Sequence, residues 1–157
     1  MNIKSISSLI LMSGLFMTCN NVKEKDNKNI TLLSVAVLFD QLEILKKLLS
    51  QNKININEVD SDSYTALHYA VEKSDPAIAI ELLSIEGVDV DIVDGLGMTP
   101  FHRAICFGNQ GAFRQLLDSG AYTNQPDGKG RSLLHLSISG RNFEIFQEIF
   151  SRNDICA

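Results

Sequence analysis

A six-residue pattern returns at a nearly constant interval along the chain. Its clearest form is TPFHRA at residues 99–104, and related forms are TALHYA at 65–70, SLLHLS at 132–137 and a degraded TLLSVA at 31–36. Successive copies begin 34, 34 and 33 residues apart. A period of this length indicates stacked copies of one unit that cannot bury its apolar face alone, so it constrains the fold more than any other feature.

The residues of the pattern explain why each copy should begin a helix. Thr99 is a good N-cap because its hydroxyl can accept from a free amide of the first turn, and Pro100 suits the first helical position. Phe101 supplies bulk for a core, whereas Ala104 is small enough to let neighbouring helices approach closely. The pattern therefore predicts a helix that begins near Pro100 and packs against its neighbours.

The four copies also align outside the six residues. An aspartate lies five residues before each copy, at Asp26, Asp60, Asp94 and Asp127. Three residues after the aspartate, where a turn needs positive φ, stand Asn29, Ser63, Gly97 and Gly130. Apolar pairs recur at the end of a second helix, at 48–49, 82–83, 116–117 and 149–150. Each unit is therefore predicted to be a helix, a turn, a second helix and an extended hairpin.

The six-residue pattern closely resembles the TPLHxA of ankyrin repeats. The resemblance implies an all-α repeat fold, an ankyrin solenoid of about four helix-turn-helix repeats with short β-hairpin loops. The repeats would lie near 31–64, 65–98, 99–131 and 132–157, within a domain spanning 30–157. The resemblance also implies that each histidine bonds the Thr side chain and the backbone of an adjacent repeat. The structural residues would then be Thr65, His68, Thr99, His102, Ser132 and His135.

The beginning of the chain has the features of an export signal. Lys4 precedes an apolar run from Ile6 to Met17 that is too short to span a bilayer but suits a signal-peptide core, so residues 1–18 are predicted to be a signal peptide. The run ends in LFMTC, which resembles a bacterial lipobox and would make Cys19 the lipidated first residue of the mature chain. Met17 and Thr18 depart from the usual small pair, which leaves ordinary cleavage near the same place open.

Residues 19–29 are rich in Asn and Lys and have no apolar period, so they are predicted to be a polar tether. With this signal the chain is expected to be exported to the cell envelope, in the periplasm or at the outer membrane. Any membrane contact would be made through the lipid alone.

Composition is that of one globular domain, and charge argues against nucleic acid as a partner. The 157 residues are 45% hydrophobic, with 14 Lys and Arg against 19 Asp and Glu, for a formal net charge of −5. A phosphate polymer would be repelled by this excess of acid.

The sequence offers no group suited to catalysis, cofactor binding or metal binding. All three histidines occupy the same position of the repeat, so none is left as a general base. Asp89, Asp91 and Asp94 lack the spacing of a calcium loop, and residues 128–132 lack the spacing of a phosphate loop. We therefore predict that the chain is not an enzyme and has no cofactor.

Two cysteines remain if Cys19 carries lipid. Cys106 is expected near the end of a first helix and Cys156 after a second helix, about 10 Å apart along the helix direction. A disulfide needs Cα atoms within about 7 Å, so two free thiols are predicted.

Three functions fit these observations. The first is a monomeric protein-binding module held at the envelope, because stacked repeats present an extended surface. The second is an immunity or accessory protein that binds one specific toxin or enzyme. The third is a carrier of a small molecule, haem or a metal through Cys106 and an exposed histidine, although the placement of every histidine at the structural position of the repeat counts against it.

In the family, partners are recognised by the residues around the turn and at the end of the first helix. We call the corresponding set in this chain the strip: Leu38, Phe39, Ser61, Asp62, Tyr64, Glu72, Lys73, Leu96, Met98, Cys106, Phe107, Lys129, Arg131 and Ser139. Its middle is apolar and one end is basic, which resembles a protein interface with a few dominant anchors. The other candidate surface is an exposed apolar end around Ile145 and Ile149.

Overall fold

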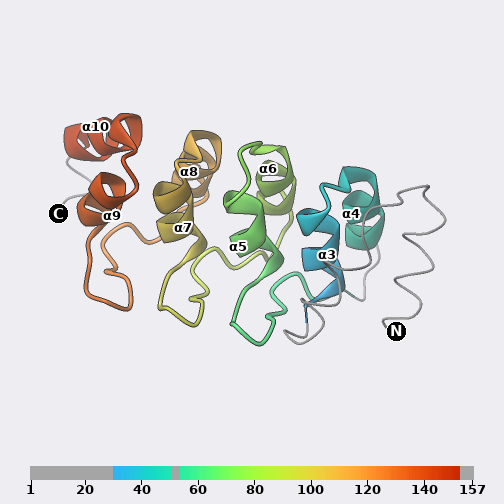
Figure 1. The fold of residues 1–157 in the computed structure, drawn as a ribbon. Helices are drawn as coiled ribbons and strands as arrows, with labels where there is room; N and C mark the ends of the chain where they lie inside the picture. The colour runs from blue at the N-terminus through green and yellow to red at the C-terminus, as the bar shows by residue number, and fades with distance from the viewer. Residues whose placement is uncertain (1–29, 51–53, 153–157) are drawn as a thin grey trace.

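The computed structural model describes residues 30–50 and 54–152. The predicted signal peptide, Cys19, the tether and Cys156 lie outside these residues. The described chain folds into helix pairs that stack in sequence order into one row (Figure 1). This arrangement confirms the predicted all-α solenoid.

Each repeat is counted from the hairpin that precedes its first helix, and it contributes a first and a second helix. The first helices are α3 (Leu32–Leu38), α5 (Ala66–Val71), α7 (Pro100–Phe107) and α9 (Leu133–Ser139). The second helices are α4 (Leu42–Leu49), α6 (Ala77–Leu83), α8 (Gln110–Asp118) and α10 (Phe143–Ser151). Figure 1 shows the second helices in an upper row, the first helices below them and the hairpin loops projecting downward. Among residues 30–50 and 54–152, no helix has both the length and the apolar character needed to cross a membrane.

Threonine caps begin the first helices of repeats two and three. The Thr99 side chain accepts from the His102 backbone amide, while the His102 side chain accepts from the Thr99 amide, and Thr65 makes the same reciprocal arrangement with His68. These caps satisfy amides that the first turn of a helix leaves free.

His68 and His102 also connect their repeats to the next one. The Thr65 amide donates to Nδ1 of His68 at 3.2 Å, so the ring carries its proton on Nε2 and donates it to the Met98 carbonyl at 3.1 Å. His102 makes the equivalent bond to the Gln125 carbonyl at 2.8 Å. Burial lowers the pKa of both imidazoles, although the bonds to the carbonyl oxygens oppose this shift.

His135 differs from these two histidines and corrects the role implied for it. Its ring is exposed and its Nδ1 lies 2.7 Å from the Ser132 hydroxyl. Within the described residues no repeat follows α10, so His135 meets no carbonyl of a neighbouring repeat. Ser132 makes no side-chain hydrogen bond to the start of α9 in this part of the chain. The inter-repeat connection therefore depends on two histidines here.

Large side chains fill the core and small ones let helices approach. The rings of Phe101 and Phe113 stack with their centroids 5.2 Å apart, and both are fully buried. Ala70 and Ala104 are also fully buried, on the first helices of adjacent repeats. This packing is continuous from one repeat to the next, as expected for a solenoid.

Buried aspartates organise the hairpins. Asp94 accepts the amides of Leu96 and Met98 on Oδ1, and Asp60 and Asp127 make the same pair of bonds in their own loops. Ser63 has φ of 62°, close to the 68° of Gly97, as the turn alignment predicts. The described residues form no β-strand, so these hairpins are tight turns and not strand pairs.

Candidate functional site

The hairpin tips stack in a row and present three positions of the strip side by side. Asp62, Leu96 and Lys129 each lie two residues after the turn aspartate. The Gly95 amide donates to the Asp62 carbonyl at 2.8 Å, and Gly128 lies too close to the Leu96 carbonyl to accommodate a side chain. These backbone contacts hold neighbouring tips together.

The strip residues differ widely in exposure. Leu96 and Phe107 are 57% and 54% exposed, so they are the accessible apolar side chains of the strip. The exposed polar members are Ser61, Lys129 and Ser139. The half-buried members are Leu38, Phe39, Asp62, Tyr64, Glu72, Lys73, Cys106 and Arg131. Whether these residues contact a partner remains a prediction.

Met98 is a correction to the predicted strip. Its side chain belongs to the core and is only 5% exposed. Its backbone is also held, because the amide donates to Asp94 and the carbonyl accepts from His68. Met98 therefore fixes the hairpin before α7 against repeat two and offers no side chain to a partner.

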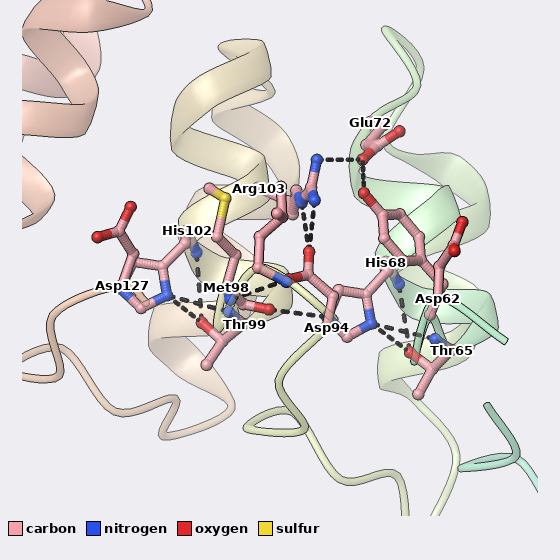
Figure 2. A network of polar contacts seen from close by, with 12 residues as sticks. Asp62, Thr65, His68, Glu72, Asp94, Met98, Thr99, His102, Arg103 and Asp127 are labelled. Carbon is pink, nitrogen blue, oxygen red and sulfur yellow. Dashed lines mark hydrogen bonds and ion pairs between the residues drawn. The ribbon is translucent and has the colours of Figure 1, made fainter. Parts of the chain in front are cut away.

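A polar network that includes two strip residues joins repeats two and three (Figure 2). Arg103 donates through Nε and Nη2 to Asp94 Oδ2 at 2.7 and 2.5 Å, and through Nη1 to Glu72 at 3.2 Å. Tyr64 donates its hydroxyl to the same Glu72 oxygen at 3.3 Å, and the Arg103 guanidinium lies 4.8 Å from the centroid of the Tyr64 ring. Two strip residues, Tyr64 and Glu72, are thus committed to internal contacts.

The electrostatics of this network follow from burial. Burial raises the pKa of Tyr64, and the neighbouring Glu72 carboxylate raises it further. Burial also raises the pKa of Glu72, while the Arg103 guanidinium opposes that shift. Tyr64 therefore stays neutral and remains a hydrogen-bond donor to Glu72.

The charged ends of the strip are partly neutralised by internal partners. Lys73 donates to the Leu38 carbonyl at 2.8 Å and lies 3.0 Å from Asp40, so it connects repeats one and two. Arg131 lies 2.7 Å from Asp127. Although burial works against ionisation, the amides and guanidinium that surround Asp127 hold its pKa below the usual range.

Lys129 is the accessible cation at the basic end of the strip. It is exposed, and among the described residues it forms no ion pair. The basic end expected from the sequence is therefore carried mainly by Lys129, with Arg131 held by its own turn.

Cys106 lies on α7, is half-buried and carries a free thiol. Burial raises the pKa of this thiol, and nearby Arg131 and Arg103 oppose the shift only in part. A raised pKa lowers the fraction of Cys106 that is ionised to the thiolate, which is the form that attacks electrophiles or binds metals. Cys156 is outside the described residues, so the predicted pair of free thiols is described for Cys106 alone.

The described residues contain no group of three or more His, Cys, Asp or Glu that could hold a metal ion. His68 and His102 use both ring nitrogens in hydrogen bonds.

Two asparagines strengthen the repeat contacts without having been singled out from the sequence. Asn109 donates to the carbonyls of Val71 and Lys73 in the preceding repeat, and Asn142 donates to that of Ile105. Both stand immediately before a second helix. Their equivalent spacing, 33 residues, is the signal that could have identified them.

Comparison with known proteins agrees with the geometry. A family model described as ankyrin repeats (three copies) matches residues 3–91 and again residues 73–157. The first match begins inside the segment predicted to be a signal peptide. No curated protein matches the chain.

Ankyrin repeats are generally protein–protein interaction modules. The two matches cover nearly the whole sequence, and the capped first helices, bridging histidines and stacked hairpins supply the corresponding structure. The chain belongs to the ankyrin-repeat family.

Proposed function

We propose that this chain is a non-catalytic protein-binding module, held at the bacterial cell envelope, that recognises a specific partner through the exposed residues of the strip. That the chain binds a protein follows from the family, whose members generally bind proteins. The choice of the strip as the binding surface rests on the chemistry of the hairpin tips.

The observation that carries the proposal is a contrast between equivalent positions within the chain. The turn aspartate is the same in repeats two, three and four, and it makes the same backbone bonds each time. Two residues further on, the tips carry an acid, an apolar residue and a base at Asp62, Leu96 and Lys129. A constant scaffold with differing chemistry at matched surface positions is suited to recognising one partner and rejecting others.

Leu96 and Phe107 are the best candidates for anchors. Both are more than half exposed. Leu96 precedes α7 and Phe107 is its last residue, so they lie in the middle of the strip. Interfaces commonly take most of their affinity from a few apolar or aromatic side chains that become fully buried on binding. The internal network of Arg103 keeps the surface around them ordered before a partner arrives.

The envelope location is supported by the sequence at the beginning of the chain. Lys4, the apolar run from Ile6 to Met17 and the following cysteine have the order of a lipoprotein signal. Lipid on Cys19 would then place the repeats beside a membrane at the end of the polar tether.

Affinity capture from envelope extract, followed by mass spectrometry, tests this function. We expect the wild-type chain to retain one predominant protein, and a Leu96→Asp, Phe107→Asp variant to lose it while its unfolding transition is unchanged. The control is Ile80→Asp, which adds one carboxylate, against the two of the strip variant, to an exposed residue of α6 away from the hairpins.

Loss of capture in the control, with retention in the strip variant, would contradict recognition by the strip. A toxin or an enzyme as the retained protein would give the module an immunity or accessory role.

A further inference from the structure

The sequence predicts two candidate surfaces, and they differ in what lies at their centres. Ile145 and Ile149, around which an exposed apolar end was expected, are instead buried in the core. Leu96, at the middle of the strip, is 57% exposed. Because only an accessible side chain can anchor a partner, the strip is the surface whose chemistry indicates the kind of partner that fits.

The hairpin tips of the strip form a row along which the charge changes sign. Asp62, Leu96 and Lys129 occupy one position in three successive repeats, since the backbone amide of each donates to the turn aspartate two residues earlier. Leu96 and Lys129 are exposed and Asp62 is half-buried. The tips therefore present the order acid, apolar, base from repeat two to repeat four.

The neighbours of these three side chains are small. Leu96 and Lys129 each stand between two glycines, and Asp62 stands between two serines. Around Gly130 there is open space, because nothing lies within 4 Å of the place that a Cβ would take. Residues with little or no side chain allow the backbone of a ligand to approach closely. The row of tips is therefore open to a segment of chain that lies along it.

The spacing of the tips suits an extended segment. Figure 1 shows each hairpin below its own first helix, and packed helices lie about 8–10 Å apart. A polyproline II segment rises about 3.1 Å per residue and completes a turn in three residues, so every third side chain lies on one side at intervals of about 9 Å. Three side chains of such a segment can therefore meet three successive tips.

The charge of the whole repeats follows the same order as the tips. Residues 54–86 contain seven Asp or Glu and one Lys, residues 87–120 contain four acids and two Arg, and residues 121–152 contain three acids and four Lys or Arg. A segment with its base at repeat two and its acid at repeat four is attracted at both ends, whereas the opposite orientation is repelled at both.

Internal ion pairs leave this order in place. At the acidic end, Lys73 lies 3.0 Å from Asp40. At the basic end, Asp127 lies 2.7 Å from Arg131. The charges of opposite sign at each end are thus offset within the chain, so the tips keep the sign of their own repeat.

We propose that the partner presents to the strip an extended segment with a basic side chain at Asp62, an apolar side chain at Leu96 and an acidic side chain at Lys129. This inference rests on the proposed function, because it takes the strip as the binding surface. It adds the chemical class of the ligand, which is a peptide segment with a base, an apolar residue and an acid about three residues apart.

Selection of random short peptides displayed on phage, with the full chain in detergent as the target, tests this class. We expect enriched peptides to contain a base, an apolar residue and an acid, in that order or its reverse, about three residues apart. Enrichment of uniformly basic peptides, which attraction to the net charge of −5 alone would give, overturns the proposal. A selection without a common charge order, or without enrichment, overturns it as well.

The Leu96→Asp, Phe107→Asp variant separates this inference from the proposed function. If the peptides enriched on the wild-type chain lack the charge order but no longer bind this variant, the strip is the binding surface and only the class of ligand is wrong. If the variant enriches the same peptides as the wild type, the strip is not the binding surface and both proposals fail.

Charge reversal at one end of the strip tests the register. Lys129→Glu should weaken binding of a selected synthetic peptide at least about fivefold, and replacing the acid of the peptide by Lys should restore most of the loss. The matched control is Lys47→Glu, which makes the same change at an exposed residue of α4 and should alter the affinity less than about twofold. Fluorescence anisotropy measures the affinity, and circular dichroism confirms folding. Equal affinities of Lys129→Glu and the control overturn the proposal.

A second copy of the chain is the competing occupant, because the order acid, apolar, base is complementary to itself when reversed. Sedimentation equilibrium of the full chain in density-matched detergent, without peptide, decides between them. We expect a monomer over the concentration series. Self-association that Lys129→Glu abolishes would make a second copy the occupant and overturn the proposal.

Discussion

His68 donates a hydrogen bond from Nε2 to the backbone carbonyl of Met98, 3.1 Å away and 30 residues further along the chain. The same ring receives the Thr65 amide on Nδ1, so one side chain caps its own helix and holds the next hairpin. His102 repeats this arrangement with Thr99 and Gln125. Each of the two neutral imidazoles therefore caps the start of its own helix and also holds the following repeat, so together they connect repeats two, three and four.

Replacing His102 by Ala should lower the free energy of unfolding by about 1 to 3 kcal/mol, because the Gln125 carbonyl and the Thr99 amide both lose a partner. Urea denaturation measures the change. His135→Ala is the matched control, since its ring is exposed at the same position of the repeat, and it should change the free energy by less than about 0.5 kcal/mol. Equal effects at the two positions would refute the bridging role.

Stability should fall as the pH drops below about 6.5. Burial lowers the pKa of His68 and His102 in the folded chain, so just below the unfolded pKa the unfolded state binds more protons than the folded state. The free energy of unfolding then decreases by at most about 1.4 kcal/mol per pH unit for each histidine.

Urea denaturation at about pH 7.5, 6.5 and 5.5 measures this slope, since the histidine contribution is complete above the unfolded pKa. His102→Gln should reduce the slope, because it removes one of the two buried titrating rings. A free energy of unfolding that is constant over this range would contradict the prediction that the two buried histidines make the fold less stable in acid.

Arg103→Met should destabilise the fold by about 2 to 4 kcal/mol, because it leaves the fully buried Asp94 carboxylate with backbone amides alone and removes the partner of Glu72. Thermal or urea unfolding gives the difference. Arg114→Met is the control, since the Arg114 ion pair with Glu148 is exposed and should contribute only about 0 to 1 kcal/mol. If the two variants lose similar stability, the network in Figure 2 does not hold repeats two and three together.

Cys19→Ser should abolish incorporation of labelled fatty acid and release the chain from the detergent phase, because no thiol would remain at the lipobox-like position. Cys106→Ser is the control and should be labelled as the wild type is. Labelling of the Cys19→Ser variant would exclude this cysteine as the lipid attachment site.

The features that repeat along the sequence could be predicted, because they depend on local geometry. The Thr65 and Thr99 caps and the positive φ of Ser63 follow from residues a few positions apart. The bridging role of the two histidines was implied by the resemblance to ankyrin repeats. The period then placed these local units in one stack.

The remaining features depend on what each repeat meets across the stack. Met98 was expected at the surface, but its hairpin is held against repeat two and the side chain joins the core. Arg103 reaches Glu72 31 residues earlier, a pairing that no local pattern contains. His135 has the same local sequence context as His102 but no neighbouring repeat among the described residues, so its ring is exposed.

Hydrogen–deuterium exchange of the chain with its captured partner bound is the most direct test of recognition through the strip. The account predicts that binding slows amide exchange in the hairpin tips and at the ends of α5 and α7, around Asp62, Leu96, Phe107 and Lys129. Slower exchange confined to the second helices α4, α6 and α8, with the hairpin tips unchanged, would contradict it.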